Sequence, residues 1–312
     1  MTDRLTNIQQ LVARFTEVKV VGLDLGSAAV KVVELGRSEG RVTLRRAAVK
    51  EASPPLDLKR FLSAAGITAE RVALGLASPE VITKPFQFPP MPRKELNRAI
   101  QLEAEQTVLN GHALSDVVID WHTLPCQATE SIRGLLAVVP KAIMADQVRI
   151  VKEAGLMPAV VDVAGLALWN AYWVLLGKEE PLAKTVLLIN VGARSSTLVI
   201  AKGPDELMLV RDFELGAQAL RGGHPNDWLS EVTDSLAYAR SKAGLRTLDA
   251  AYVTGGASSL EITLQLKQIL QVPVTIWNPF DQITREPFSA SLDHSLGPLL
   301  TVAIGLALRQ PG

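Results

Sequence analysis

The chain has 312 residues, 48% hydrophobic and 21% charged, which is enough for two hydrophobic cores. Lys plus Arg and Asp plus Glu each number 32, and this balance excludes nucleic acid as a main ligand. The single cysteine, Cys126, excludes an internal disulfide, and no metal-ligand spacing of the C-x-x-C or H-E-x-x-H type occurs. The N-terminus lacks the apolar core of a signal peptide, so we expect a reducing, cytoplasmic setting.

The first predicted element, residues 1–17, is an amphipathic segment with its apolar residues at helical spacing. We expect this helix to pack on its own domain, with a membrane surface or a partner as the alternative. Residues 18–35 follow as a β-hairpin, because two β-branched runs flank a short turn of small residues. Asp24 and Gly26 lie at the centre of this hairpin.

A related pattern returns at Val186–Ala201 and predicts an internal repeat. At one constant offset, Asn190 aligns with Asp24 and Gly192 aligns with Gly26. Turns built from Gly and small residues expose backbone N–H groups that can bind phosphate oxygens. An ordinary tight turn is the alternative for either hairpin taken alone. Two such turns that face each other are expected to hold a polyphosphate between them.

Strands and helices alternate in the rest of the first half. Residues 81–131, which contain a proline-rich break, are predicted to be a small inserted β-α-β subdomain, after which 134–140 rejoins the main sheet. The polar stretch Lys178–Pro181 marks the domain boundary. The predicted elements are strand 41–50, helix 56–65, strands 71–77 and 81–88, helix 93–109, strands 117–124 and 134–140, helix 141–154, strand 159–163 and helix 166–176.

The second half repeats the same order, so residues 18–180 and 181–312 are predicted to be two α/β domains around a cleft. A third glycine turn, Gly255-Gly256-Ala257, runs from a strand end into a helix, where an adenine or ribose could lie. A tight strand-to-helix turn is the alternative. The predicted elements are strands 185–190, 195–201 and 206–213, helix 226–242, strand 250–254, helix 258–270, strand 272–276 and helix 295–308.

These motifs resemble the actin and hexokinase superfamily and, within it, the PilM family of type IV pilus assembly proteins, which is related to the division protein FtsA. The resemblance covers nearly the whole chain and implies duplicated actin-like (RNase H-like) domains with an inserted 1C-type subdomain. The Glu-Ala-Glu-Gln helix is its most specific motif. The matching stretches are Gly22–Ser27 with Val30-Lys31, Gly192-Ala193 with Arg211-Asp212, Met91-Pro92 with Glu103–Gln106, Val139–Lys141, Ala154–Leu156, and Val161-Asp162 with Ala167-Leu168.

Two departures from the family pattern concern the second half. The family usually carries Asp where this chain has Asn190. Residues 214–249 alone separate the third strand from the fourth, so most of a 2B-type subdomain, which meets the nucleoside in the family, is predicted to be missing. We therefore expect weaker binding of Mg²⁺ and very slow or absent hydrolysis.

The resemblance implies a cytoplasmic scaffold, peripheral to the inner membrane, that binds the N-terminal tail of a PilN-like inner-membrane protein. Together with the inserted segment 81–131, it leads us to expect this tail between that segment and the first domain. It also implies ATP or ADP with Mg²⁺ in the cleft and leaves self-association open. No catalytic residue is assigned, and Asp24 is expected to hold Mg²⁺ through water. The residues expected to bind the nucleotide are Asp24, Gly26, Ser27, Ala28, Lys31, Asn190, Gly192, Ala193, Arg194, Gly255, Gly256 and Ala257.

Two other functions fit parts of the same sequence. A platform without nucleotide, like the cytoplasmic part of the type II secretion protein GspL, is favoured by Asn190 and by the short second half. A sugar or acid kinase requires a carboxylate as general base near an acceptor hydroxyl. Asp162 is a candidate for that base, but no acceptor-binding constellation accompanies it.

Overall fold

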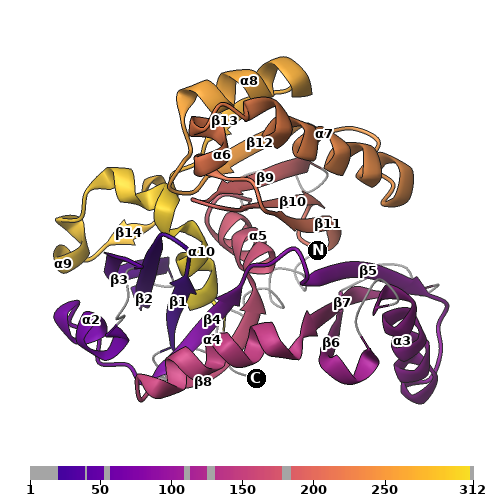
Figure 1. Ribbon diagram of the computed structural model, residues 1–312, viewed down its shortest axis with the longest axis horizontal. Coiled ribbons are helices and arrows are strands. Elements are labelled where there is room, and N and C mark those ends of the chain that lie inside the picture. The colour runs from indigo at the N-terminus through magenta and orange to yellow at the C-terminus, as the bar shows by residue number, and fades with distance from the viewer. Residues whose placement is uncertain are drawn as a thin grey trace.

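The computed structural model describes residues 20–38, 41–52, 57–108, 113–124, 131–177 and 184–309. The predicted helix at 1–17, Cys126 and the boundary at Lys178–Pro181 lie outside these residues. The described strands form two sheets with helices on their faces (Figure 1). None of the described helices combines the length and apolar character that crossing a bilayer demands.

The first sheet has the strand order β14-β3-β2-β1-β4-β8 among the described residues. Strands β1, β2 and β3 form an antiparallel meander, and β4 and β8 run parallel to β1. Parallel neighbours require crossover connections, which contain the helices α2 and α4. The bounds are β1 (Val20–Leu25), β2 (Ala29–Ser38), β3 (Arg41–Glu51), α2 (Leu58–Ala64), β4 (Arg71–Leu76), α4 (Lys141–Glu153) and β8 (Met157–Val163).

The second sheet contains the same five-strand order in β11-β10-β9-β12-β13. Asn190 pairs with Thr197 across β9 and β10, as Asp24 pairs with Lys31 across β1 and β2. The predicted repeat is therefore confirmed at the level of strand order and register. The bounds are β9 (Thr185–Val191), β10 (Ser196–Lys202), β11 (Glu206–Phe213), α6 (Ala217–Arg221), α7 (Pro225–Lys242), β12 (Ala250–Thr254), α8 (Leu260–Leu270) and β13 (Val274–Ile276).

The segment between β4 and α4 extends the second sheet, not the first. The prediction that residues 134–140 rejoin the first sheet is wrong, because β7 lies between β5 and β6. Leu136 and Val138 of β7 are buried against α3, and this packing keeps the strand in the inserted unit. The bounds are β5 (Ile82–Phe88), α3 (Arg93–Val108), a 3-10 turn at Leu114–Asp116, β6 (Val117–Thr123) and β7 (Ile132–Pro140).

The last part of the chain returns to the first sheet, where β14 pairs with β3. Helix α10 packs on β1 and crosses α5 between the two sheets (Figure 1). A β-carbon at Gly305 of α10 would overlap the Ala167 carbonyl of α5, and one at Gly22 of β1 would overlap the Ala303 carbonyl. The bounds are α5 (Ala164–Leu175), 3-10 turns at Pro279–Asp281 and His294–Leu296, β14 (Thr284–Arg285), α9 (Pro287–Ala290) and α10 (Gly297–Ala307).

Candidate functional site

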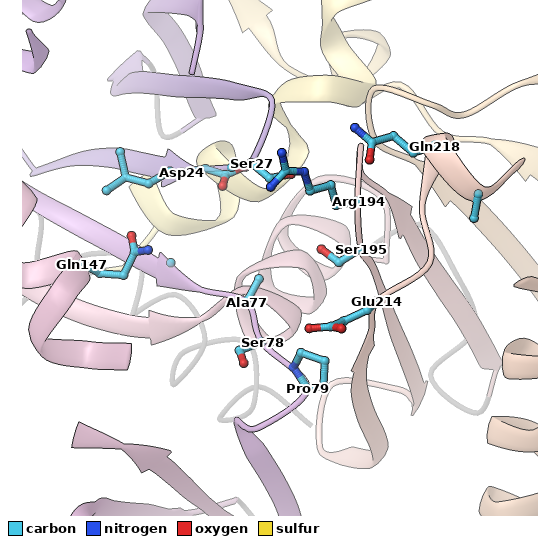
Figure 2. A pocket seen from close by; sticks show the side chains of 14 residues that line it. Asp24, Ser27, Ala77, Ser78, Pro79, Gln147, Arg194, Ser195, Glu214 and Gln218 are labelled. Carbon is cyan, nitrogen blue, oxygen red and sulfur yellow. The ribbon is translucent and has the colours of Figure 1, made fainter. Parts of the chain in front are cut away.

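The two glycine turns face each other across a cleft between the sheets. An inner cavity of about 390 Å³ is lined by both turns and by residues of α5, α6 and α10. An outer cavity of about 730 Å³ adjoins it, and Asp24, Gly26 and Ser27 line both cavities (Figure 2). The topology thus brings the two halves of the sequence repeat to one site, at the end of β1 and of β9.

Most of the predicted binding residues line the inner cavity, and two do not. Arg194 lines the outer cavity, whereas Gly255 is buried and lines neither. The role of Gly255 is in the turn, because its φ of 95° and its contact with the Val191 backbone leave no room for a side chain. The predicted residues that do line the inner cavity are Asp24, Gly26, Ser27, Ala28, Lys31, Asn190, Gly192, Ala193, Gly256 and Ala257.

The first turn is held by an ion pair between its two flanking strands. Lys31 Nζ lies 2.8 Å from Asp24 Oδ2, and the two side chains are 12% and 19% exposed. A β-carbon at Gly26 would lie 2.5 Å from the Lys31 Nζ and 2.9 Å from the Ala29 carbonyl oxygen. The absence of a side chain at position 26 therefore lets the Lys31 ammonium reach Asp24 beside the cavity.

The second turn is joined to a short helix that follows β11. The N–H groups of Ala217 and Gln218 donate to the carbonyls of Gly192 and Ala193 at 2.9 and 3.0 Å. A β-carbon at Gly216 would lie 2.6 Å from the Gly192 carbonyl oxygen, so a glycine is needed where the helix approaches the turn. This contact brings α6 to the cleft.

The residues that α6 contributes to the cleft were not predicted from the sequence. Gln218 and Arg221 both line the inner cavity. The glycine that follows β11, Gly216, was the available signal, because a five-residue helix shows too little periodicity to be recognised. The apolar side chains of Leu299 and Val302 on α10 close the cavity floor and were also not predicted.

A side pocket of about 330 Å³ continues from the inner cavity between α6 and the turn that starts α8. Ala217, Arg221, Gly256 and Ala257 line both spaces. The third glycine turn therefore lies between the inner cavity and the side pocket. An elongated ligand can extend from one space into the other.

A buried carboxyl, Asp212 on β11, lies beside the cavity wall. The hydroxyl of Thr197 donates to Asp212 Oδ1 at 2.5 Å, and the backbone N–H of Ser78 donates to Oδ2 at 3.1 Å. Burial raises the pKa of Asp212 to about 6 from 3.8, against the opposing effect of these hydrogen bonds. Since Ser78 follows β4, this carboxyl connects the end of the first sheet to the second sheet.

The donor set at the cleft does not fit a resident Mg²⁺ ion, which prefers several free carboxylate or water oxygens. At the two turns, Asp24 is already paired with Lys31, and Asn190 offers one neutral amide oxygen. The outer cavity adds a single further carboxylate among the described residues, Glu214, which is fewer than such an ion needs. Among the described residues, His, Cys, Asp and Glu nowhere form a group of three or more that could hold a metal. The expectation that Asp24 holds Mg²⁺ through water stays a prediction that this geometry does not favour.

The kinase alternative receives no support from the position of its candidate base. Asp162 Oδ2 accepts a hydrogen bond from Arg309 Nε at 2.6 Å, and its side chain is 10% exposed. Asp162 lines neither the inner nor the outer cavity. Its carboxylate is therefore engaged away from the space where an acceptor hydroxyl would lie.

Two sheets that share a five-strand order, a pair of crossing helices and a cleft between paired hairpin turns define an α/β protein of the actin-like ATPase fold. Residues 22–222 match the family described as type IV pilus assembly protein PilM. This match spans more than half of the sequence, and the chain belongs to that family.

Two solved structures share the fold of this chain. The chain is similar to a protein solved in the PilM-PilN type IV pilus biogenesis complex, with 25% identity, a TM-score of 0.78, and coverage of 94% of this chain and 98% of that one. It is also similar in fold to the cytoplasmic domain of EpsL, an inner-membrane component of the type II secretion system of Vibrio cholerae. That likeness has 14% identity, a TM-score of 0.50 and coverage of 92% and 94%.

The pKa of Asp212 predicts how stability depends on pH. The folded-state pKa is raised, so the stabilisation by the neutral acid is complete below pH 4 and is lost as pH rises through about 6. Asn mimics the neutral acid, and Asp212→Asn should raise the free energy of unfolding at pH 8 by on the order of 1–3 kcal/mol. Urea denaturation at pH 8 and at pH 4.5 measures the gap, which should shrink at the lower pH.

The control for this prediction is Asp234→Asn, which removes an exposed carboxylate on α7. Its effect on stability should be small at both pH values. A variant Asp212→Asn that is no more stable than the wild type at pH 8 would contradict the prediction. It would mean that the ionised carboxylate is better satisfied by Thr197 and Ser78 than its burial suggests.

Proposed function

We propose that this protein is a cytoplasmic actin-like scaffold of type IV pilus assembly, peripheral to the inner membrane through its partner. Its partner is the N-terminal tail of a PilN-like inner-membrane protein. The observation that carries the proposal is the likeness over 94% of the chain to a protein solved in a PilM-PilN complex. A scaffold needs a binding surface but no catalytic base. This is consistent with the ion pair that Asp162, the candidate base, forms with Arg309.

The tail is proposed to bind at the inserted unit, in a groove of about 760 Å³. Strands β5 and β11 form its floor, and α3 and α7 stand at its two sides (Figure 1). The two floor strands share a single bridge, between Thr83 and Val210. Strand edges that diverge from one bridge leave backbone groups for an extended peptide. The Thr83 hydroxyl, buried with no partner among the described residues, is a further hydrogen-bonding group there.

Nucleotide is proposed as the ligand of the cleft. The phosphates of ATP or ADP would lie between the turns at 26–28 and 192–194, and the nucleoside would enter the side pocket. Supporting this are the shared lining of the two spaces and the glycines whose positions exclude side chains. The proposal also includes the assignment of the inserted unit as a 1C-type subdomain and the absence of most of a 2B-type subdomain.

A platform without nucleotide is the second candidate, and one observation favours it. The Asp24–Lys31 ion pair satisfies both charged groups of the first turn without any ligand. In this case the cleft would serve only to set the angle between the two halves. Calorimetric titration with ATP and ADP distinguishes the two candidates, because the platform gives no heat of binding.

The tail-binding groove predicts a hot spot at Tyr238, a 53% exposed side chain on α7 that lines it. Tyr238→Ala should leave the fold intact and weaken binding of the partner's N-terminal peptide by roughly tenfold or more. Fluorescence anisotropy with a labelled peptide measures this affinity. Leu264→Ala, which removes a 52% exposed side chain on α8 outside the groove, is the matched control.

A substitution at the other side of the inserted unit tests whether the tail binds outside the groove. Lys141 begins α4 at the junction of the inserted unit with the first half, where its ammonium donates to the Ser115 carbonyl. If Lys141→Glu abolishes peptide binding while Tyr238→Ala binds normally, the tail lies against the first half, where the family resemblance expects it. The groove assignment would then be wrong.

The phosphate placement predicts that Gly26→Val lowers ATP affinity at least roughly tenfold, as expected for the loss of charge-assisted hydrogen bonds. A side chain there would displace the Lys31 ammonium, which a β-carbon meets at 2.5 Å, and cover the turn N–H groups. Gly36→Val is the control, because the atoms nearest to a β-carbon at Gly36 belong to the flexible Arg45 side chain and not to the backbone. Equal ATP affinity in Gly26→Val and wild type would place the phosphates elsewhere.

A further inference from the structure

The charges at the cleft differ from those that a metal-bound polyphosphate requires. The Asp24 carboxylate is neutralised by Lys31 at 2.8 Å, so this pair contributes no net charge to the cavity. Asn190 occupies the corresponding position of the second turn and is neutral. A hard divalent cation bound here would find no free carboxylate at either turn.

Two arginines supply the positive charge instead. Arg194 is exposed at the tip of the second turn and extends toward Ser27 of the first turn (Figure 2). Arg221 ends α6 and lines both the inner cavity and the side pocket. Neither guanidinium has a carboxylate partner within ion-pair distance among the described residues, so both are available to an anionic ligand.

We propose that the cleft binds a nucleoside di- or triphosphate without a metal ion, and that Arg194 and Arg221 take the charge-neutralising role of Mg²⁺. This inference rests on the proposed nucleotide function and narrows its ligand to the metal-free form. Guanidinium groups donate two parallel hydrogen bonds to phosphate oxygens and keep their charge at all relevant pH values. Arg194 lines the outer cavity, whereas Arg221 lines the inner cavity and the side pocket, so the two groups can contact separate phosphates.

The proposal has a direct consequence for affinity. Mg²⁺ in solution neutralises part of the charge of ATP, and the complex is then a weaker ligand for two arginines. A site that relies on a bound metal behaves in the opposite way, because it gains affinity with the ion. The sign of the Mg²⁺ effect on binding therefore separates an arginine site from a metal site.

A site that binds the nucleotide through arginines, as proposed, would hold its ligand without hydrolysing it. Phosphoryl transfer depends on a positioned cation that stabilises charge on the transferring group. An arginine pair can hold phosphates in a fixed geometry while no water is activated by a metal. A nucleotide held in this way would stabilise one relative position of the two halves, as a scaffold requires.

Isothermal titration calorimetry with ATP, in EDTA and in excess Mg²⁺, tests this inference on the full chain. Wild-type affinity should be equal or higher in EDTA. Arg194→Gln and Arg221→Gln should each lower the affinity in EDTA by roughly tenfold to a hundredfold, the usual effect of losing a charge-assisted contact. Arg221→Lys should recover part of the ATP affinity that Arg221→Gln loses. Arg240→Gln, which removes an exposed arginine of α7 outside the cavities, should bind as the wild type.

Asn190→Asp provides the reciprocal test, because it adds a carboxylate to the inner cavity. It should weaken binding in EDTA and raise the dependence on Mg²⁺. Wild-type binding that requires Mg²⁺ would overturn the metal-free inference and leave the nucleotide proposal intact. An absence of binding in both buffers would overturn both, while the peptide affinity of Tyr238→Ala would still test the scaffold function.

Discussion

The contact between α5 and α10 determines how the two sheets lie relative to each other. Gly305 passes the Ala167 carbonyl where no side chain fits, and Gly22 of β1 passes the Ala303 carbonyl in the same way. The Asn170 amide donates to the Gly305 carbonyl at 3.2 Å and links the two helices further. Because overpacking such a contact forces the backbone apart, the distance between the sheets is set by glycine. The turns at the ends of β1 and β9 therefore face one cleft.

Two carboxylates, one in that cleft and one beside it, are satisfied by neighbouring protein groups. Asp24 is paired with Lys31, while Asp212 accepts hydrogen bonds from Thr197 and Ser78. The Ser78 contact connects the root of the inserted unit to the wall of the cavity. The proposed ligand at the turns and the proposed peptide at the insert would thus be separated by one short chain segment. This arrangement suits a protein whose cleft controls the position of a binding surface.

The repeat was predictable because alternating β-branched runs and their glycine turns depend only on local sequence. The pairing of Asp24 with Lys31 needed the register, which the hairpin supplies only once the turn length is known. Which sheet receives a strand is a tertiary property, so Leu136 of β7 could not show that it packs on α3. The same limit applies to Arg221, because the α6 helix that carries it is held by the Gly192 carbonyl.

Hydrogen–deuterium exchange with ATP most directly tests whether the two turns form one ligand site. Peptides that cover residues 26–28 and 192–194 should gain protection together in the same titration. Peptides that cover the 243–249 loop, which lines neither cavity, should not change. Protection of both turns at one ligand concentration is the predicted result. Protection confined to one turn, or its absence from both while ATP binds, would contradict a site shared by the two halves.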